Sequence, residues 1–198
     1  MEKFSIQKFD TPEPDKRMIK CYLRDNGNSE QIDTLINECA DLAREVFDCR
    51  VCSAEFPVAI SESTVDFGFA SVESASLAKH LAGCDRAVIF GATVGLGIDR
   101  LIMKYSGVSA LKALCLDAAG SDMIENVCDL FNERINAEYK STVSRFSPGY
   151  GDLPIEFQRD IFNALNLNKN LGVYLTEGMQ MTSSKSVTAI IGANNESN

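Results

Sequence analysis

The segment 145–154, with the sequence RFSPGYGDLP, combines side chains that could bind a small molecule with a backbone that must turn. Its two prolines and two glycines are incompatible with a helix interior or a central strand, so the segment is expected to be a shaped loop. Pro148 fixes its own φ, and Gly149 is free to adopt a positive φ and to let a ligand approach the backbone. Arg145 carries a planar guanidinium suited to a carboxylate, and Tyr150 carries an aromatic ring with a polar tip. The alternative interpretation is a surface turn whose Arg and Tyr have no ligand.

Cysteine is the second residue type that could do chemistry here. Cys49 and Cys52 form a Cys-x-x-Cys pair, but a structural zinc site needs four ligands. The chain has no second such pair, and its single histidine, His80, is distant in sequence. A thioredoxin-like pair would begin a helix, whereas this one leads into an alternating, strand-like stretch. We therefore expect no metal site, and we interpret the seven cysteines as reduced and mostly buried.

A glycine-rich stretch, 91–99, follows the short apolar run 86–90 and precedes a helical pattern. A strand, a glycine-rich turn and a helix together could hold a phosphate. However, no Lys-Ser/Thr follows the glycines, so the P-loop pattern is absent, and so is the Gly-x-Gly-x-x-Gly spacing of dinucleotide sites. We expect a tight structural turn.

Composition limits the classes of partner. The chain has 198 residues, 45% of them hydrophobic, which is enough for the core of one domain. The net charge of −9 disfavours binding to nucleic acids and to anionic membrane surfaces. No apolar run approaches the roughly 20 residues needed to span a bilayer. The first residues, MEKFS, lack an apolar signal core, so a cytoplasmic location is expected.

Helical and strand-like patterns are interleaved along the chain. The segments expected to be helical are 15–24, capped by Asp15, 29–47, capped by Ser29, 74–82, 108–140 and 152–165, capped by Asp152. The segments expected to be strands are 51–60, 65–69, 86–90, 172–176 and 186–191. Gly120 and Ser121 are expected either to bend the long helix or to allow close packing against it. These patterns predict a single α+β domain, mainly an antiparallel twisted sheet layered with helices, over residues 15–192. Residues 1–14 are expected to be a flexible arm and 193–198 a polar tail.

The motif Arg-x-x-x-Gly-Tyr at 145–150 resembles a loop of the reactivation domain of cobalamin-dependent methionine synthase, which binds S-adenosylmethionine. Three further stretches are similar to the same domain. The helix 123–134 matches the helix before that loop, 175–181 resembles the Leu-Thr-Glu-Ser segment of the family, and 184–187 matches a small-x-Ser-Val turn. The resemblance covers roughly residues 84–191.

The resemblance implies a free-standing reactivation subunit that supports methyl transfer from S-adenosylmethionine to cobalamin. The cob(II)alamin would be carried by a partner, either a corrinoid-binding protein or methionine synthase modules acting in trans. A flavodoxin- or ferredoxin-type protein would supply the electron. Both reactants are strongly activated, so the protein needs only to position them.

The resemblance also implies roles for single residues. Arg145 would bind the methionine carboxylate, and Glu125 would bind the amino group or a ribose hydroxyl. Ser147 and Gly149 would offer backbone groups to the adenine, and Tyr150 would pack beside it or face the corrin. The alternative for Glu125 is a solvated helix residue without a ligand.

Departures from the family favour two other functions. No counterpart is found for the family's ligand-contacting N-terminal aspartate, its C-terminal tyrosine, or the histidine after the loop, near whose place Glu156 stands. The protein could therefore be a non-catalytic module that binds S-adenosylmethionine or docks a corrinoid protein. It could also be a scaffold for the corrinoid protein, with no small-molecule ligand.

Overall fold

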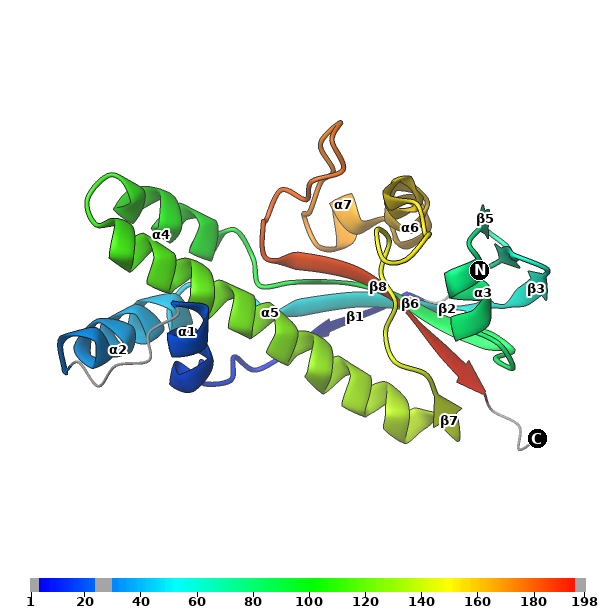
Figure 1. Ribbon diagram of the computed structural model, residues 1–198, viewed down its shortest axis with the longest axis horizontal. Coiled ribbons are helices and arrows are strands. Elements are labelled where there is room, and N and C mark those ends of the chain that lie inside the picture. Colours follow the sequence, from blue (N-terminus) through cyan, green and yellow to red (C-terminus); the bar gives the residue numbers. More distant parts are fainter. Residues whose placement is uncertain (1–3, 24–29, 195–198) are drawn as a thin grey trace.

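An antiparallel five-stranded sheet forms the centre of the computed structural model, which describes residues 4–23 and 30–194 (Figure 1). Across the sheet the strands are β1 (Ser5–Lys8), β2 (Arg50–Pro57), β6 (Arg86–Thr93), β8 (Ser186–Asn194) and β7 (Ser141–Thr142). All four neighbouring pairs are antiparallel. Strand β6 buries seven of its eight residues, because helices cover both faces of the sheet and leave no solvated side for polar residues.

The helices form two layers, one on each face (Figure 1). One face packs against α1 (Lys16–Tyr22), α2 (Glu30–Arg44), α4 (Gly97–Ser106) and the 29-residue α5 (Ala110–Glu138). The other packs against α3 (Ala75–His80), the 3-10 helix η1 (Ile155–Phe157), α6 (Gln158–Leu165) and α7 (Leu167–Asn170). Strand β6 contributes alternate residues to the two cores: Val88, Phe90 and Ala92 to the first, Ala87 and Ile89 to the second. The predicted α+β class and the long helix are confirmed.

A small second sheet consists of β3 (Ala59–Ser61), β4 (Thr64–Asp66) and β5 (Ser71–Glu73). Residues 51–60, predicted as one strand, are therefore divided between two sheets. The break follows Pro57, whose missing N–H cannot continue a ladder. The rings of Phe56 and Phe69, with centroids 4.6 Å apart, join the two sheets into one core.

Gly120 provides the close packing that was one of its two predicted roles. A β-carbon there would lie 3.0 Å from Cγ of Lys185 and 3.1 Å from Cγ1 of Ile98. The absence of a side chain lets Lys185 cross α5 and place its Nζ 2.8 Å from Asp117 and 2.9 Å from Ser121 Oγ. This contact attaches the chain before β8 to the long helix.

The predicted cap at Asp152 was wrong, because this carboxylate caps a different helix. It accepts hydrogen bonds from Ser74 Oγ at 2.5 Å, Ala75 N at 2.9 Å and Ser76 N at 3.0 Å, at the start of α3. The chain after the loop instead begins with η1, which has no side-chain cap. Asp152 thus fastens the loop to α3, a contact between segments 76–78 residues apart that local sequence cannot reveal.

We expect the protein to lose stability at low pH in part through Asp152. Its hydrogen bonds, chiefly that from Ser74, lower the pKa of Asp152 to about 2. Because the folded-state pKa lies below the unfolded value of about 3.9, this contribution is present above about pH 4 and is lost as the pH falls toward 2. Asp152→Asn should lower the denaturant midpoint at pH 7 and should flatten the dependence of that midpoint on pH between 4 and 2. A variant with an unchanged slope in that range would contradict the assignment.

Three other expectations differ from the structure. Residues 5–8 form the edge strand β1 instead of a flexible arm, and Ala193 and Asn194, assigned to the tail, are the last two residues of β8. Residues 172–176 form no strand. Thr176 N donates to Gln180 O and Thr182 N donates to Tyr174 O, and these bonds close a turn. The turn contains one isolated β-bridge, between Leu175 and Met181. The predicted turn at 25–28 and the cap Ser29 lie outside the described residues.

Within the described ranges, no helix has both the length and the apolarity needed to cross a membrane.

Candidate functional site

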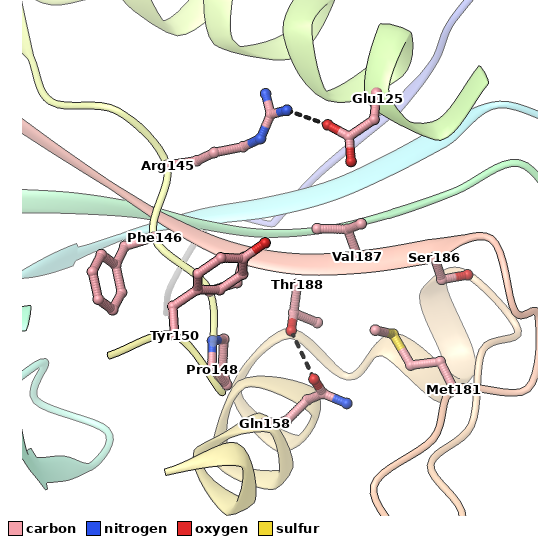
Figure 2. Close-up of a pocket in the computed structure, with 11 residues that line it drawn as sticks. Glu125, Arg145, Phe146, Pro148, Tyr150, Gln158, Met181, Ser186, Val187 and Thr188 are labelled. Carbon is pink, nitrogen blue, oxygen red and sulfur yellow. Dashed lines mark hydrogen bonds and ion pairs between the residues drawn. The ribbon is translucent and has the colours of Figure 1, made fainter. Parts of the chain in front are cut away.

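A cavity of about 380 Å³ lies between α5, the 145–150 loop, α6 and the beginning of β8 (Figure 2). Its walls come from these four segments and from Met181, which precedes β8. The lining residues are Glu125, Arg145, Phe146, Ser147, Pro148, Tyr150, Gln158, Met181, Ser186, Val187 and Thr188. Four of the five site residues predicted from sequence are among them.

The fifth, Gly149, does not line the cavity but shapes the loop that does. Its φ is +91°, the positive value for which glycine is suited. Its N–H donates to Leu153 O at 2.9 Å, and Tyr150 N donates to Ser147 O at 3.1 Å. The loop therefore uses the amides of Gly149 and Tyr150 to hold its own shape, and only Ser147 of the two predicted backbone contributors lines the cavity.

Arg145 is held by two carboxylates of α5. Its Nη2 lies 2.5 Å from Glu125 Oε2, and its Nη1 lies 2.6 Å from Asp129 Oδ1. Figure 2 shows Arg145 and Glu125 reaching toward each other across one end of the cavity. Partial burial opposes the charge of Arg145, but the hydrogen bond to Asp129 and nearby acidic groups outweigh it and raise its pKa. The cluster carries one positive and two negative charges, a net charge of −1.

Asp129 was missed from sequence, although its position contains a signal. It lies four residues after Glu125, and residues so spaced share one face of a helix. Both carboxylates are more than half exposed, 54% and 62%, while Arg145 itself is only 24% exposed. Glu125 lines the cavity, whereas Asp129 holds Arg145 without lining it.

The opposite wall is formed by Gln158 and β8. The Gln158 side chain is buried and donates from Nε2 to Met179 O at 3.0 Å, while Thr188 Oγ1 donates to Gln158 Oε1 at 3.4 Å. These bonds attach the turn at 176–180 to the sheet. In Figure 2, Thr188 points toward Gln158, whereas Val187 points toward α5. In the sequence, Gln158 lies among the apolar residues of a predicted helix, which is a sign that it could be buried. Its hydrogen-bond partners could not be predicted from sequence.

The edge of β8 has no described strand partner at Thr188, which lines the cavity and is 2% exposed. Ile190 exchanges both backbone hydrogen bonds with Phe146, at 2.9 and 2.8 Å. Backbone groups two residues apart on an antiparallel strand point to the same side, so the N–H and C=O of Thr188 also point away from β6. Because β7 pairs only with Ala193 and Asn194, no described strand covers this part of the edge. The cavity therefore contains a backbone donor and an acceptor in the arrangement of a strand edge.

Tyr150 stands at the mouth of the cavity. Its side chain is 68% exposed, and its ring lies 6.5 Å from that of Phe146 in an edge-to-face arrangement. Ile155, 40% exposed, lies next to the same loop. An exposed aromatic ring at a cavity mouth is suited to stacking on a flat ligand or a partner surface.

Cys49 and Cys52 do not face a common site. Cys49 belongs to the core on one face of the sheet and Cys52 to the core on the other. Burial raises the pKa of Cys49 to about 11 and also raises that of Cys52, so both are neutral thiols at pH 7. Among the described residues, no group of three or more His, Cys, Asp and Glu side chains has an arrangement that could hold a metal.

We expect the double variant Cys49→Ser/Cys52→Ser to keep any ligand binding and to lose stability. Placing two hydroxyls in apolar surroundings costs about 1–3 kcal/mol for each group that lacks a hydrogen bond. Urea unfolding and elemental analysis would test this expectation. Stoichiometric zinc in the wild type that disappears in the variant would show that the thiols are ligands.

These features define an antiparallel α+β domain in which a charged cluster and an open strand edge line one cavity. No protein-family model and no curated protein sequence matches the chain. Among solved structures, it is similar to the crystal structure of the MetH reactivation domain bound to AdoHcy, with a TM-score of 0.70. The match covers 98% of this chain and 80% of that one, at 15% sequence identity. The chain therefore has the fold of the MetH reactivation domain, as its sequence resemblance implied.

Proposed function

We propose that the cavity binds S-adenosylmethionine and that the protein presents its methyl group to cobalamin carried by another protein. The observation that carries the proposal is the Arg145–Glu125–Asp129 cluster at one end of a cavity of about 380 Å³. This volume is within the range of small-molecule sites, roughly 300–1,000 Å³. The structure of the same fold bound to AdoHcy, the demethylated form of this ligand, supports the choice.

The charges of the cluster match those of the methionine end of the ligand. A carboxylate would pair with the guanidinium of Arg145, and an ammonium would pair with Glu125, the carboxylate of the cluster that lines the cavity. The sulfonium brings the net charge of S-adenosylmethionine to +1, which complements the net charge of −1 on the cluster. AdoHcy has no sulfonium charge and a net charge of zero.

The adenosine end would lie toward the open edge of β8. An adenine ring carries a donor and an acceptor side by side, which the N–H and C=O of Thr188 could match. Ser147 O, which already accepts from Tyr150 N, has a second lone pair for the ligand. Tyr150 would cover the flat face of the base or contact the partner.

The chain supplies binding and orientation in this scheme. When bound, S-adenosylmethionine would supply an activated methyl group, and reduced cobalamin on the partner would accept it. Arg145 and Glu125 would fix one end of the ligand and the β8 edge the other, so that the sulfonium between them has one orientation. No general base is needed, which is consistent with a site whose ionisable lining residues, among those the structure describes, are Glu125, Arg145 and Tyr150.

Preference for the charged ligand would test the electrostatic part of the proposal. We expect S-adenosylmethionine to bind more tightly than AdoHcy by about 1–2 kcal/mol, the energy of a unit charge about 8–16 Å from a net unit charge at an effective dielectric constant of about 20. Glu125→Gln should reduce this difference, and higher salt should reduce it further. Calorimetry with both ligands provides the measurement. Equal affinities in the wild type would contradict the proposed placement of the sulfonium.

Methyl transfer itself requires a reconstituted assay. The protein, S-adenosylmethionine, a flavodoxin- or ferredoxin-type reductant and a corrinoid protein in the cob(II)alamin state would be mixed. We expect the methylcobalamin spectrum to appear with wild-type protein and with Arg159→Ala, and to be lost with Arg145→Ala. Arg159 is an exposed arginine of α6 that does not line this cavity. Methylation that is equally fast without the protein would overturn the proposed activity.

The second candidate is a non-catalytic module that binds S-adenosylmethionine and docks a corrinoid protein. The exposure of Tyr150 and Ile155 beside the cavity favours it, since exposed apolar side chains at a cavity mouth are suited to a partner. Ligand binding without methyl transfer in the same assay would support this function.

A further inference from the structure

A second cavity, of about 360 Å³, lies where the end of β6 meets the start of α4 and the chain on both sides of the 174–182 turn. It shares no lining residue with the first cavity. Its charged lining residues are Arg50, Arg100 and Asp48, so positive charge is in excess although the whole chain is strongly acidic.

The first turn of α4 faces this cavity without a cap. The helix has ten residues, its N-cap residue Leu96 makes no side-chain hydrogen bond to the first turn, and Asp99 is the acidic residue within that turn. The leading N–H groups of a helix have no intrahelical acceptor. Gly97, the first helical residue, lines the cavity and packs against Val46, where a β-carbon would lie 2.8 Å from Val46 Cβ. The start of α4 therefore packs closely against Val46 on one side and borders the cavity on the other.

A buried hydroxyl donor points to a ligand independently of the helix. Thr93 Oγ1 accepts from Ser186 Oγ at 2.9 Å and from Gly95 N at 3.1 Å. Its remaining contact is Ser183 Oγ at 3.1 Å, so the Thr93 hydrogen is donated to Ser183. The hydrogen of Ser183 is then left without an acceptor in the described part of the chain. Ser183 is only 3% exposed and lines the cavity.

Both arginines also have unused donors. Arg50 donates from Nη2 to Leu171 O at 2.9 Å. Its Nε lies 2.9 Å from Asp48 Oδ2, but the N–H is misaligned, so this buried nitrogen has an ionic contact and no hydrogen bond. Arg100 has neither an ion pair nor a side-chain hydrogen bond with any described residue, and it is exposed at the rim.

We propose that this cavity is a second binding site, for a phosphate group. Two guanidinium groups, the amides of an uncapped helix and a buried hydroxyl supply donors from several directions, which suits a tetrahedral oxyanion better than a planar one. The volume exceeds that of a single phosphate ion, so a phosphate monoester of a small molecule would also fit. The site would bind without catalysing a reaction, and it does not depend on the function proposed for the first cavity.

Amide chemical shifts of the full chain would test the site directly. Inorganic phosphate, glycerol 3-phosphate and acetate would be titrated separately at constant ionic strength. We expect saturable shifts of the Gly97 and Ile98 amides with both phosphates and none with acetate. Tighter binding of the ester would identify a phosphorylated small molecule as the ligand class, and tighter binding of the inorganic ion would identify free phosphate.

Matched variants would assign the donors. Arg100→Gln is expected to weaken phosphate binding about tenfold, the effect of losing one charge-assisted hydrogen bond. Arg159→Gln removes the same charge from α6 and should leave the affinity unchanged. Ser183→Ala should also weaken binding, with the protein folded according to its spectrum. The proposal is overturned if phosphate causes no saturable shifts, if acetate competes equally, or if Arg100→Gln and Arg159→Gln behave alike.

Discussion

Arg145→Ala is expected to weaken the binding of S-adenosylmethionine by about 2–5 kcal/mol, the usual effect of truncating one partner of a desolvated charge pair. Arg145 is the least exposed member of its cluster and the only cation among the described residues that line the cavity. Its loss would remove the partner of the ligand carboxylate and leave Glu125 and Asp129 to repel that carboxylate. Calorimetry of the wild type and the variant would measure the change.

Arg145→Lys should recover only part of the lost affinity. An ammonium is a single point of charge and cannot reproduce the planar fork that contacts Glu125 and Asp129 with separate nitrogens. Arg159→Ala is the control for charge alone. If Arg145→Ala bound as tightly as the wild type, or if the wild type failed to bind at millimolar ligand, the site assignment would be wrong.

Phe131→Ala is expected to lower the free energy of unfolding by about 3–5 kcal/mol, the range for truncating a buried Phe. Phe131 is a fully buried residue of α5, and its ring centroid lies 4.7 Å from that of Phe90 on β6. This contact attaches the helix that carries Glu125 and Asp129 to the centre of the sheet. Denaturant unfolding would measure the loss.

Leu130→Ala is the matched control, because Leu130 is the preceding residue of α5 and is 39% exposed. It should cost much less, since less apolar surface leaves the core. A loss below about 1 kcal/mol for Phe131→Ala would mean that the helix repacks without the ring, contrary to the close packing of protein interiors.

Local sequence was sufficient for the features that depend on local physics. The long helix at 110–138 follows from its apolar periodicity, and the cap of α1 at Asp15 follows from side-chain chemistry, with Asp15 accepting from Arg17 N at 2.8 Å. The loop around Pro148 and Gly149 follows from backbone restriction. The position of Arg145 next to Glu125 followed from family resemblance and not from spacing alone.

Tertiary structure decided every contact whose energy comes from distant segments. From sequence, Asp152 was expected to cap the helix that follows it. In the fold it lies beside Ser74, so it caps α3 instead. The strand β1 was not predicted, because its sequence has little alternation of apolar and polar residues. It is held at the sheet edge by backbone hydrogen bonds to β2, which do not require a particular side-chain pattern. Residues 172–176 have a strand-like composition but find no neighbouring strand and close a turn instead. Gln158, Thr188 and the uncapped start of α4 became parts of cavities only when the sheet placed them beside other elements. The sequence alone thus determined which residues carry suitable chemistry, and the packing of the sheet and its two helical layers determined which of them meet.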